Sequence, residues 1–131
     1  MDRPLRVLVI DDDEVARVAL GQTLRDVGWE TFELPSAEGA SRVISENNIV
    51  AVVLDVMMPG IGGDKLARLL RAGPHGQHLG IVLVSGRPTN ELKALAIEAQ
   101  ADSVVNKRDV PTSLAHAVLD ACSRRASATW G

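Results

Sequence analysis

Aspartates directly follow two of the hydrophobic runs in this chain of 131 residues. Residues 6–10 are followed by the three aspartates 11–13, and residues 49–54 are followed by Asp55. Both runs are short, rich in β-branched residues and almost free of polar ones, which is typical of buried strands. Acids crowded at the ends of such strands repel one another unless a cation or a proton offsets their charge. The pattern therefore predicts a divalent metal site and phosphate chemistry.

Two further polar residues follow later hydrophobic runs. Ser85 comes after residues 81–84 and supplies a hydroxyl group, and Lys107 comes after residues 103–106 and supplies an ammonium group. Carboxylate oxygens suit Mg²⁺, which also keeps waters and bridges to phosphate. At one crevice, carboxylates, metal, hydroxyl and lysine would neutralise a phosphoryl group in transfer. A carboxylate can itself act as the nucleophile and form an aspartyl-phosphate.

The elements that must position these residues alternate along the chain. Strands are predicted at residues 6–10, 29–34, 49–54, 80–84 and 103–106, and helices at about 14–27, 37–46, 63–72, 90–99 and 111–125. This alternation predicts an α/β fold, a parallel five-stranded sheet covered on both faces. The common doubly wound, flavodoxin-like strand order for five such units is 2-1-3-4-5. It makes the first and third strands neighbours, so Asp11, Asp12 and Asp55 would meet in the crevice at their carboxyl ends.

The composition is that of one ordinary globular domain. Hydrophobic residues make up 46% of the chain and charged residues 24%. The net charge of -3, with no basic block, argues against direct binding of nucleic acid or of an anionic membrane. The single cysteine, Cys122, and the lack of a recognisable signal peptide or membrane span make the cytoplasm the expected location. We expect one domain at residues 1–125, followed by a C-terminal tail at residues 126–131.

Four segments fall at the ends of the first, third, fourth and fifth predicted strands: VIDDD at residues 9–13, LDVMMPG at residues 54–60, VSG at residues 84–86, and Lys107. Through these segments the chain resembles the receiver domain of bacterial two-component response regulators, from residue 7 to about residue 123. The resemblance implies a phosphorylated switch that catalyses only its own phosphorylation and dephosphorylation, and is otherwise not an enzyme.

The resemblance also implies a role for each acid. Asp55 would be the phosphoacceptor. Asp12, Asp55 and the backbone carbonyl of Met57 would ligate Mg²⁺. Asp11 would help to position the metal indirectly, through water.

The remaining site residues and the partners follow from the same resemblance. Ser85 would donate to a phosphoryl oxygen, and Lys107 would pair with the acceptor and then with the phosphoryl group. The phosphoryl group would come from a sensor histidine kinase or a histidine phosphotransfer protein. The output would pass to a downstream effector protein or to an output domain outside this chain. Receivers occur as monomers and as dimers, so the resemblance leaves a homodimer open.

The expected output surface is the face made by the fourth helix, the fifth strand and the fifth helix. Leu92, Leu95 and residues 104–109 are expected on or near it. Two residues in this region depart from the family pattern. Arg108 stands where most receivers have a proline joined by a cis peptide, so the loop is expected to be trans or rearranged. Val104 stands where most receivers have an aromatic residue whose movement accompanies activation, so a signal would have to be transmitted differently.

Other interpretations of the same residues are open at this level. Asp13 is expected to cap the first helix rather than to bind a metal. A pseudo-receiver would keep the fold and act as a phosphorylation-independent binding module. The spacing of Asp11 and Asp13, with Ser85, also fits a phosphatase similar to the haloacid dehalogenases, in which Asp11 is the nucleophile and Asp13 the general acid and base. That interpretation leaves Asp55 without a role.

Overall fold

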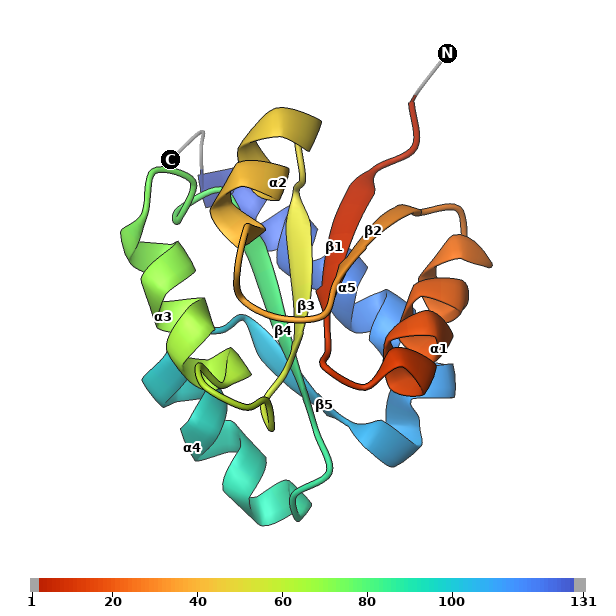
Figure 1. Cartoon of the computed structure of the whole chain (residues 1–131), viewed down its shortest axis with the longest axis vertical. Coiled ribbons are helices and arrows are strands. Elements are labelled where there is room, and N and C mark those ends of the chain that lie inside the picture. The colour runs from red at the N-terminus through yellow and green to blue at the C-terminus, as the bar shows by residue number, and fades with distance from the viewer. Residues whose placement is uncertain (1–2, 129–131) are drawn as a thin grey trace.

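The computed structural model describes residues 3–128 as five strands and the helices that connect them (Figure 1). The strands are β1 (Arg6–Ile10), β2 (Glu30–Leu34), β3 (Ala51–Asp55), β4 (Gly80–Ser85) and β5 (Ser103–Asn106). The helices are α1 (Glu14–Arg25), α2 (Ala40–Asn47), α3 (Gly63–Ala72), α4 (Thr89–Ala99), the 3₁₀ turn η1 (Lys107–Asp109) and α5 (Val110–Ala128). All strand pairs are parallel, and the order is β2-β1-β3-β4-β5. The predicted α/β architecture and strand order are confirmed.

The sheet separates two hydrophobic cores, because successive side chains of a strand point to opposite faces. On β1, Leu8 and Ile10 belong to the core under α2, α3 and α4, whereas Val7 and Val9 belong to the core under α1 and α5. The central strands β1, β3 and β4 are buried on both faces, which explains their nearly continuous runs of aliphatic residues. Figure 1 shows the helices covering the sheet on its two sides.

Several element boundaries differ from those predicted. Helix α2 begins at Ala40 rather than at residue 37, because Gly39 has φ +83° and a left-handed residue cannot continue a right-handed helix. Helix α5 begins at Val110 and extends through Ala128, three residues beyond the predicted end. Of the predicted tail, residues 129–131 lie outside the described part of the chain. Among residues 3–128, no helix combines the length and apolar character that a membrane span requires.

Candidate functional site

Three acids meet at the carboxyl ends of β1 and β3. The two strands pair in register, with Ile10 opposite Leu54, so the next residues along each strand, Asp11 and Asp55, are neighbours. Asp12 joins them, and one carboxylate oxygen from each of the three acids lies within 4.8 Å of the other two. Asp11 and Asp55 are buried, whereas Asp12 is exposed. The structure thus brings together the acids that the strand order predicts.

Two buried oxygens of this cluster lack hydrogen-bond partners among the described residues. They are Oδ2 of Asp11 and Oδ1 of Asp55. A buried acceptor without a partner costs about 1–3 kcal/mol, and more when it is charged. A hard cation held by these oxygens, directly or through a bound water, would remove that cost, and the exposed carboxylate of Asp12 suits a Mg²⁺ ion that keeps part of its water. Asp11, Asp12 and Asp55 are therefore the residues that could hold the ion.

The electrostatics of the cluster also favour a cation. Burial raises the pKa of Asp55, and the neighbouring charge of Asp11 raises it further. Burial likewise raises the pKa of Asp11, although the backbone N–H of Asp13 lowers it in part, with a donor–acceptor distance of 2.9 Å to Asp11 Oδ1. Lys107 lowers the pKa of both carboxyl groups. One lysine thus partly offsets the repulsion, which is consistent with a site that also accepts a cation.

Lys107 reaches the cluster from the end of β5. Its Nζ lies 3.4 Å from Asp55 Oδ1, which makes an ion pair but is too long for a well-formed hydrogen bond. The lysine side chain is 46% exposed while that of Asp55 is 3% exposed, so the ammonium group lies at the rim and the acceptor at the floor. A small hollow of about 150 Å³ opens beside Lys107 and Asp11, and apolar residues of α1, β4 and α5 complete its lining. Lys107 therefore pairs with Asp55 from the rim of the site.

Ser85 ends the strand between Asp55 and Lys107. β4 lies between β3 and β5, with Asp55 opposite Val84 and Ser85 opposite Asn106. The serine is fully buried, and its Oγ accepts a hydrogen bond from the backbone N–H of Arg87 at 3.1 Å. Within residues 3–128, no acceptor takes the hydroxyl hydrogen of Ser85.

Asn106, which the sequence suggested only as a strand residue, fastens two loops beside the site. Its Nδ2 donates to the carbonyl of Arg87 at 2.9 Å, and its Oδ1 accepts from the N–H of Arg108 at 3.1 Å. The first loop follows Ser85 and the second carries Lys107. The only sequence signal was a polar residue at the end of a hydrophobic run, which does not identify a partner. Asn106 thus fixes the two loops that carry the hydroxyl and the ammonium groups.

Asp13 has the capping role that the sequence predicted. It precedes α1 in an extended conformation, and its Oδ2 accepts from the N–H of Ala16 at 3.0 Å. A carboxylate engaged in this way is poorly placed to be a general acid and base. The geometry therefore does not favour the phosphatase interpretation, which requires Asp13 for proton transfer and leaves Asp55 unused.

The structure shows how the chain accommodates Arg108 and Val104, the two residues that depart from the family pattern. No described residue has a cis peptide bond, so the bond between Lys107 and Arg108 is trans, and the chain continues into the 3₁₀ turn η1. Val104 is partly buried and packs against the core under α2, α3 and α4. Leu92 and Leu95, expected on or near the output face, are both buried, and Leu92 lines a hollow between α4, β5 and α5 together with Val104 and Asn106. Ile97 is a large apolar residue that α4 exposes, with 78% of its surface accessible.

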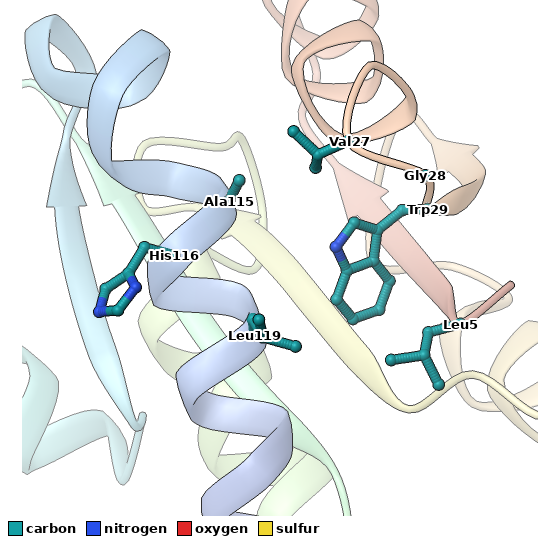
Figure 2. Close-up of a pocket in the computed structure, with 7 residues that line it drawn as sticks. All are labelled: Leu5, Val27, Gly28, Trp29, Ala115, His116 and Leu119. Carbon is teal, nitrogen blue, oxygen red and sulfur yellow. The ribbon is translucent and has the colours of Figure 1, made fainter.

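An apolar hollow of about 300 Å³ lies at the opposite end of the sheet (Figure 2). Leu5 precedes β1 and Trp29 precedes β2, so the hollow lies by the amino ends of these strands, where they face Leu119 of α5. It contains no carboxylate. The acids, the hydroxyl and the lysine therefore gather at one end of the molecule and this apolar hollow lies at the other.

The comparisons with known proteins agree with this arrangement. Residues 7–119 match the response regulator receiver domain family. The chain is 34% identical over 104 residues to the response regulator MprA of a Mycobacterium species, covering 79% of this chain and 44% of that protein. It is 28% identical over 116 residues to a gliding motility regulatory protein of Myxococcus xanthus, covering 88% of this chain and 15% of that protein. The chain thus spans less than half the length of these curated relatives.

Solved structures show the same fold. A crystal structure assigned as a response regulator from Chloroflexus aurantiacus superposes with a TM-score of 0.85 and 30% identity, covering 93% of this chain and all of that one. A CheY-like receiver domain protein from Methanospirillum hungatei, at 20% identity and a TM-score of 0.78, shares the fold. The family match over residues 7–119, together with the Chloroflexus structure at 30% identity, shows that the chain belongs to the receiver domains of two-component response regulators.

Proposed function

We propose that this receiver domain is phosphorylated on Asp55 in a Mg²⁺-dependent reaction. The observation that carries the proposal is the meeting of the three acids within 4.8 Å, with Lys107 Nζ 3.4 Å from Asp55 Oδ1. Asp12, Asp55 and the backbone carbonyl of Met57 would ligate the ion, and Asp11 would act through water. The donor would be a phosphohistidine of a sensor kinase or a phosphotransfer protein.

The residues divide the chemistry between them. A carboxylate oxygen of Asp55 attacks the phosphorus atom, an O–P bond forms, and the P–N bond of the phosphohistidine breaks with its electron pair passing to the imidazole nitrogen. Mg²⁺, when bound, supplies positive charge to the transferring oxygens. Lys107 favours the ionised, nucleophilic form of Asp55 and then pairs with the phosphoryl group, while the Ser85 hydroxyl donates to another phosphoryl oxygen.

The output would leave through α4, β5 and α5. Ile97 is exposed on α4, and Asn106 links the end of β5 to the loop after Ser85, so a change at the phosphoryl group has a short route to this face. The receptor of the signal would be an effector protein or an output domain outside the chain. The pseudo-receiver alternative is not favoured, because the acids, the hydroxyl and the lysine are all in place.

The test is phosphorylation by acetyl phosphate with and without MgCl₂, followed by intact-mass spectrometry. Wild-type protein should gain one phosphoryl group only with Mg²⁺, and hydroxylamine should remove it, as expected of an acyl phosphate. Asp55→Asn should stay unmodified, and the exposed carboxylate variant Asp26→Asn should behave as wild type. An adduct that persists in Asp55→Asn and disappears in Asp11→Asn would instead support the phosphatase interpretation.

A further inference from the structure

Arg17 holds the peptide group that joins Asp11 to Asp12. Its Nη1 donates to the Asp11 carbonyl oxygen at 2.8 Å, and its side chain is only 16% exposed. A peptide group is planar and rigid, so fixing its carbonyl sets the direction in which both flanking residues leave that plane. Both flanking residues carry carboxylates of the acidic cluster. The position of the Arg17 guanidinium group therefore affects the orientation of both Asp11 and Asp12.

Glu33 of β2 fixes Arg17 in turn. Glu33 Oε1 lies 3.5 Å from Arg17 Nε, and Glu33 Oε2 lies 3.4 Å from Arg25 Nη1. The carboxylate fits beside α1 because position 21 is glycine: a Cβ added to Gly21 would lie 2.9 Å from Glu33 Oε2. Gly21, Glu33 and Arg17 thus form a continuous support behind the loop that carries the acids.

We propose that Arg17 is a positioning residue for metal binding, which holds the Asp11–Asp12 peptide so that both carboxylates face the ion in one arrangement. This inference rests on the proposed function, because it concerns the same Mg²⁺ site. Arg17 would not touch the ion itself, because its contacts are with the Asp11 carbonyl oxygen and the Glu33 carboxylate. A guanidinium group suits this role, since its planar fork donates in two directions at once, whereas a lysine ammonium is a point charge.

Arg17 acts through geometry rather than through its charge. Arg17 is paired with Glu33, and it is not among the charges that shift the pKa of Asp11 or Asp55. Lys107, by contrast, is the cation that lowers the pKa of Asp11 and Asp55. Removing Arg17 should therefore disorder the peptide between Asp11 and Asp12 while leaving the charges around Asp55 in place.

The chain offers a matched control at the other end of β1. Arg6 pairs with Glu30 of β2 at 3.1 Å and donates to the carbonyl of Asn47 at 2.9 Å, which are the same two kinds of contact that Arg17 makes. The test is a titration of wild type, Arg17→Ala and Arg6→Ala with MgCl₂, in which the NMR signals of the backbone amides of residues 11–13 report Mg²⁺ binding. Arg17→Ala should bind Mg²⁺ about tenfold more weakly, as is common when a residue supporting a ligand is lost. Arg6→Ala should bind as wild type.

Two further variants separate positioning from folding. Gly21→Ala adds a good helix former to α1 and forces Glu33 aside, so it should keep or increase resistance to urea and still weaken Mg²⁺ binding. Arg17→Lys keeps the charge and loses the fork, and should fall between Arg17→Ala and wild type. If Arg17→Ala does not fold, Gly21→Ala decides the question on its own.

Phosphorylation by acetyl phosphate adds a second readout. In Arg17→Ala the Mg²⁺ concentration for half-maximal rate should rise about tenfold, and the rate at saturating Mg²⁺ should return close to that of wild type. Wild-type affinity in both Arg17→Ala and Gly21→Ala would overturn the positioning role and leave the proposed function intact. A wild-type protein that binds no Mg²⁺ would overturn both proposals.

Discussion

Asp55 is a buried carboxyl group that the metal-free fold holds at some loss of stability. Burial and the charge of Asp11 raise its pKa, so the folded protein takes up the proton at a higher pH than the unfolded chain. Protonated Asp55 therefore adds to the free energy of unfolding. This contribution is complete at pH values below the pKa of Asp55 in the unfolded chain, and it is lost as the pH rises through the pKa of Asp55 in the folded protein. At neutral pH, the ionised Asp55 therefore destabilises the fold relative to a neutral side chain of the same shape.

Asp55→Asn should consequently raise the free energy of unfolding at neutral pH by about 1 kcal/mol, a common size for the relief of strain at a functional site. The gain should shrink when the pH is lowered from neutral to an acidic value, because protonation of wild-type Asp55 through its raised pKa removes the same repulsion. Urea denaturation without divalent ions at both pH values measures this. Saturating Mg²⁺ should also reduce the difference in unfolding free energy between the two proteins, because the ion binds folded wild type and stabilises it. A variant less stable than wild type at neutral pH would show that the pair with Lys107 outweighs the repulsion.

The residues of the acidic site could be predicted from the sequence, but the residues that position them could not. Asp11, Asp55, Ser85 and Lys107 follow hydrophobic runs, and the strand order of a doubly wound sheet is regular enough to predict that strand ends meet. Arg17 has no such signal, because an arginine on a polar helix face normally lies in solvent. Its role depends on a carbonyl six positions away and on Glu33 of another element, and both contacts exist only in the folded chain.

At the scale of elements, the junction between β5 and α5 and the loop after β4 depend on one side chain. Asn106→Ala removes the donor to the Arg87 carbonyl and the acceptor for the Arg108 N–H. The loss should cost about 1–2 kcal/mol of unfolding free energy, since both backbone groups are partly buried. Amide exchange at Arg108 should become faster. Asn47→Ala is the control, because its amide donates only to Val43 within α2. Equal exchange at Arg108 in wild type and Asn106→Ala would show that η1 holds itself.

The types and order of the elements could be predicted, but their ends could not. Hydrophobic periodicity predicts a helix wherever apolar residues recur on one face, but it does not predict the backbone conformation at the ends of that helix. Gly39 stops α2 from beginning earlier, and α4 ends at a left-handed Gln100 although glycine and asparagine are the usual residues there. The end of α5 was placed too early because its last turns are short of apolar residues; tertiary contacts of Arg125 hold them instead.

At the scale of the whole molecule, Asp102 connects helices on the two faces of the sheet. Its carboxylate accepts from Arg71 of α3 at 3.1 Å, from Arg125 of α5 at 2.8 Å and from the N–H of Ile81 in β4 at 2.8 Å. The side chains of Asp102 and Arg71 are 4% and 8% exposed. Burial lowers the pKa of Arg71, while Asp102 raises it and so favours the charged form.

Asp102→Ala should therefore destabilise the protein by about 3 kcal/mol or more, because the buried guanidinium group of Arg71 keeps its backbone carbonyl acceptors but loses the carboxylate that balances its charge. Asp120→Ala provides the comparison: Asp120 pairs with Arg124 at 2.7 Å on the exposed surface of α5, and an exposed pair four residues apart contributes only about 0.5 kcal/mol. Urea denaturation measures both variants. If they lose equal stability, the buried network does not fasten the two layers, and the cores on either side of the sheet hold them together unaided. If only Asp102→Ala is strongly affected, and amide exchange quickens in both α3 and the end of α5, the two faces are coupled through this one carboxylate.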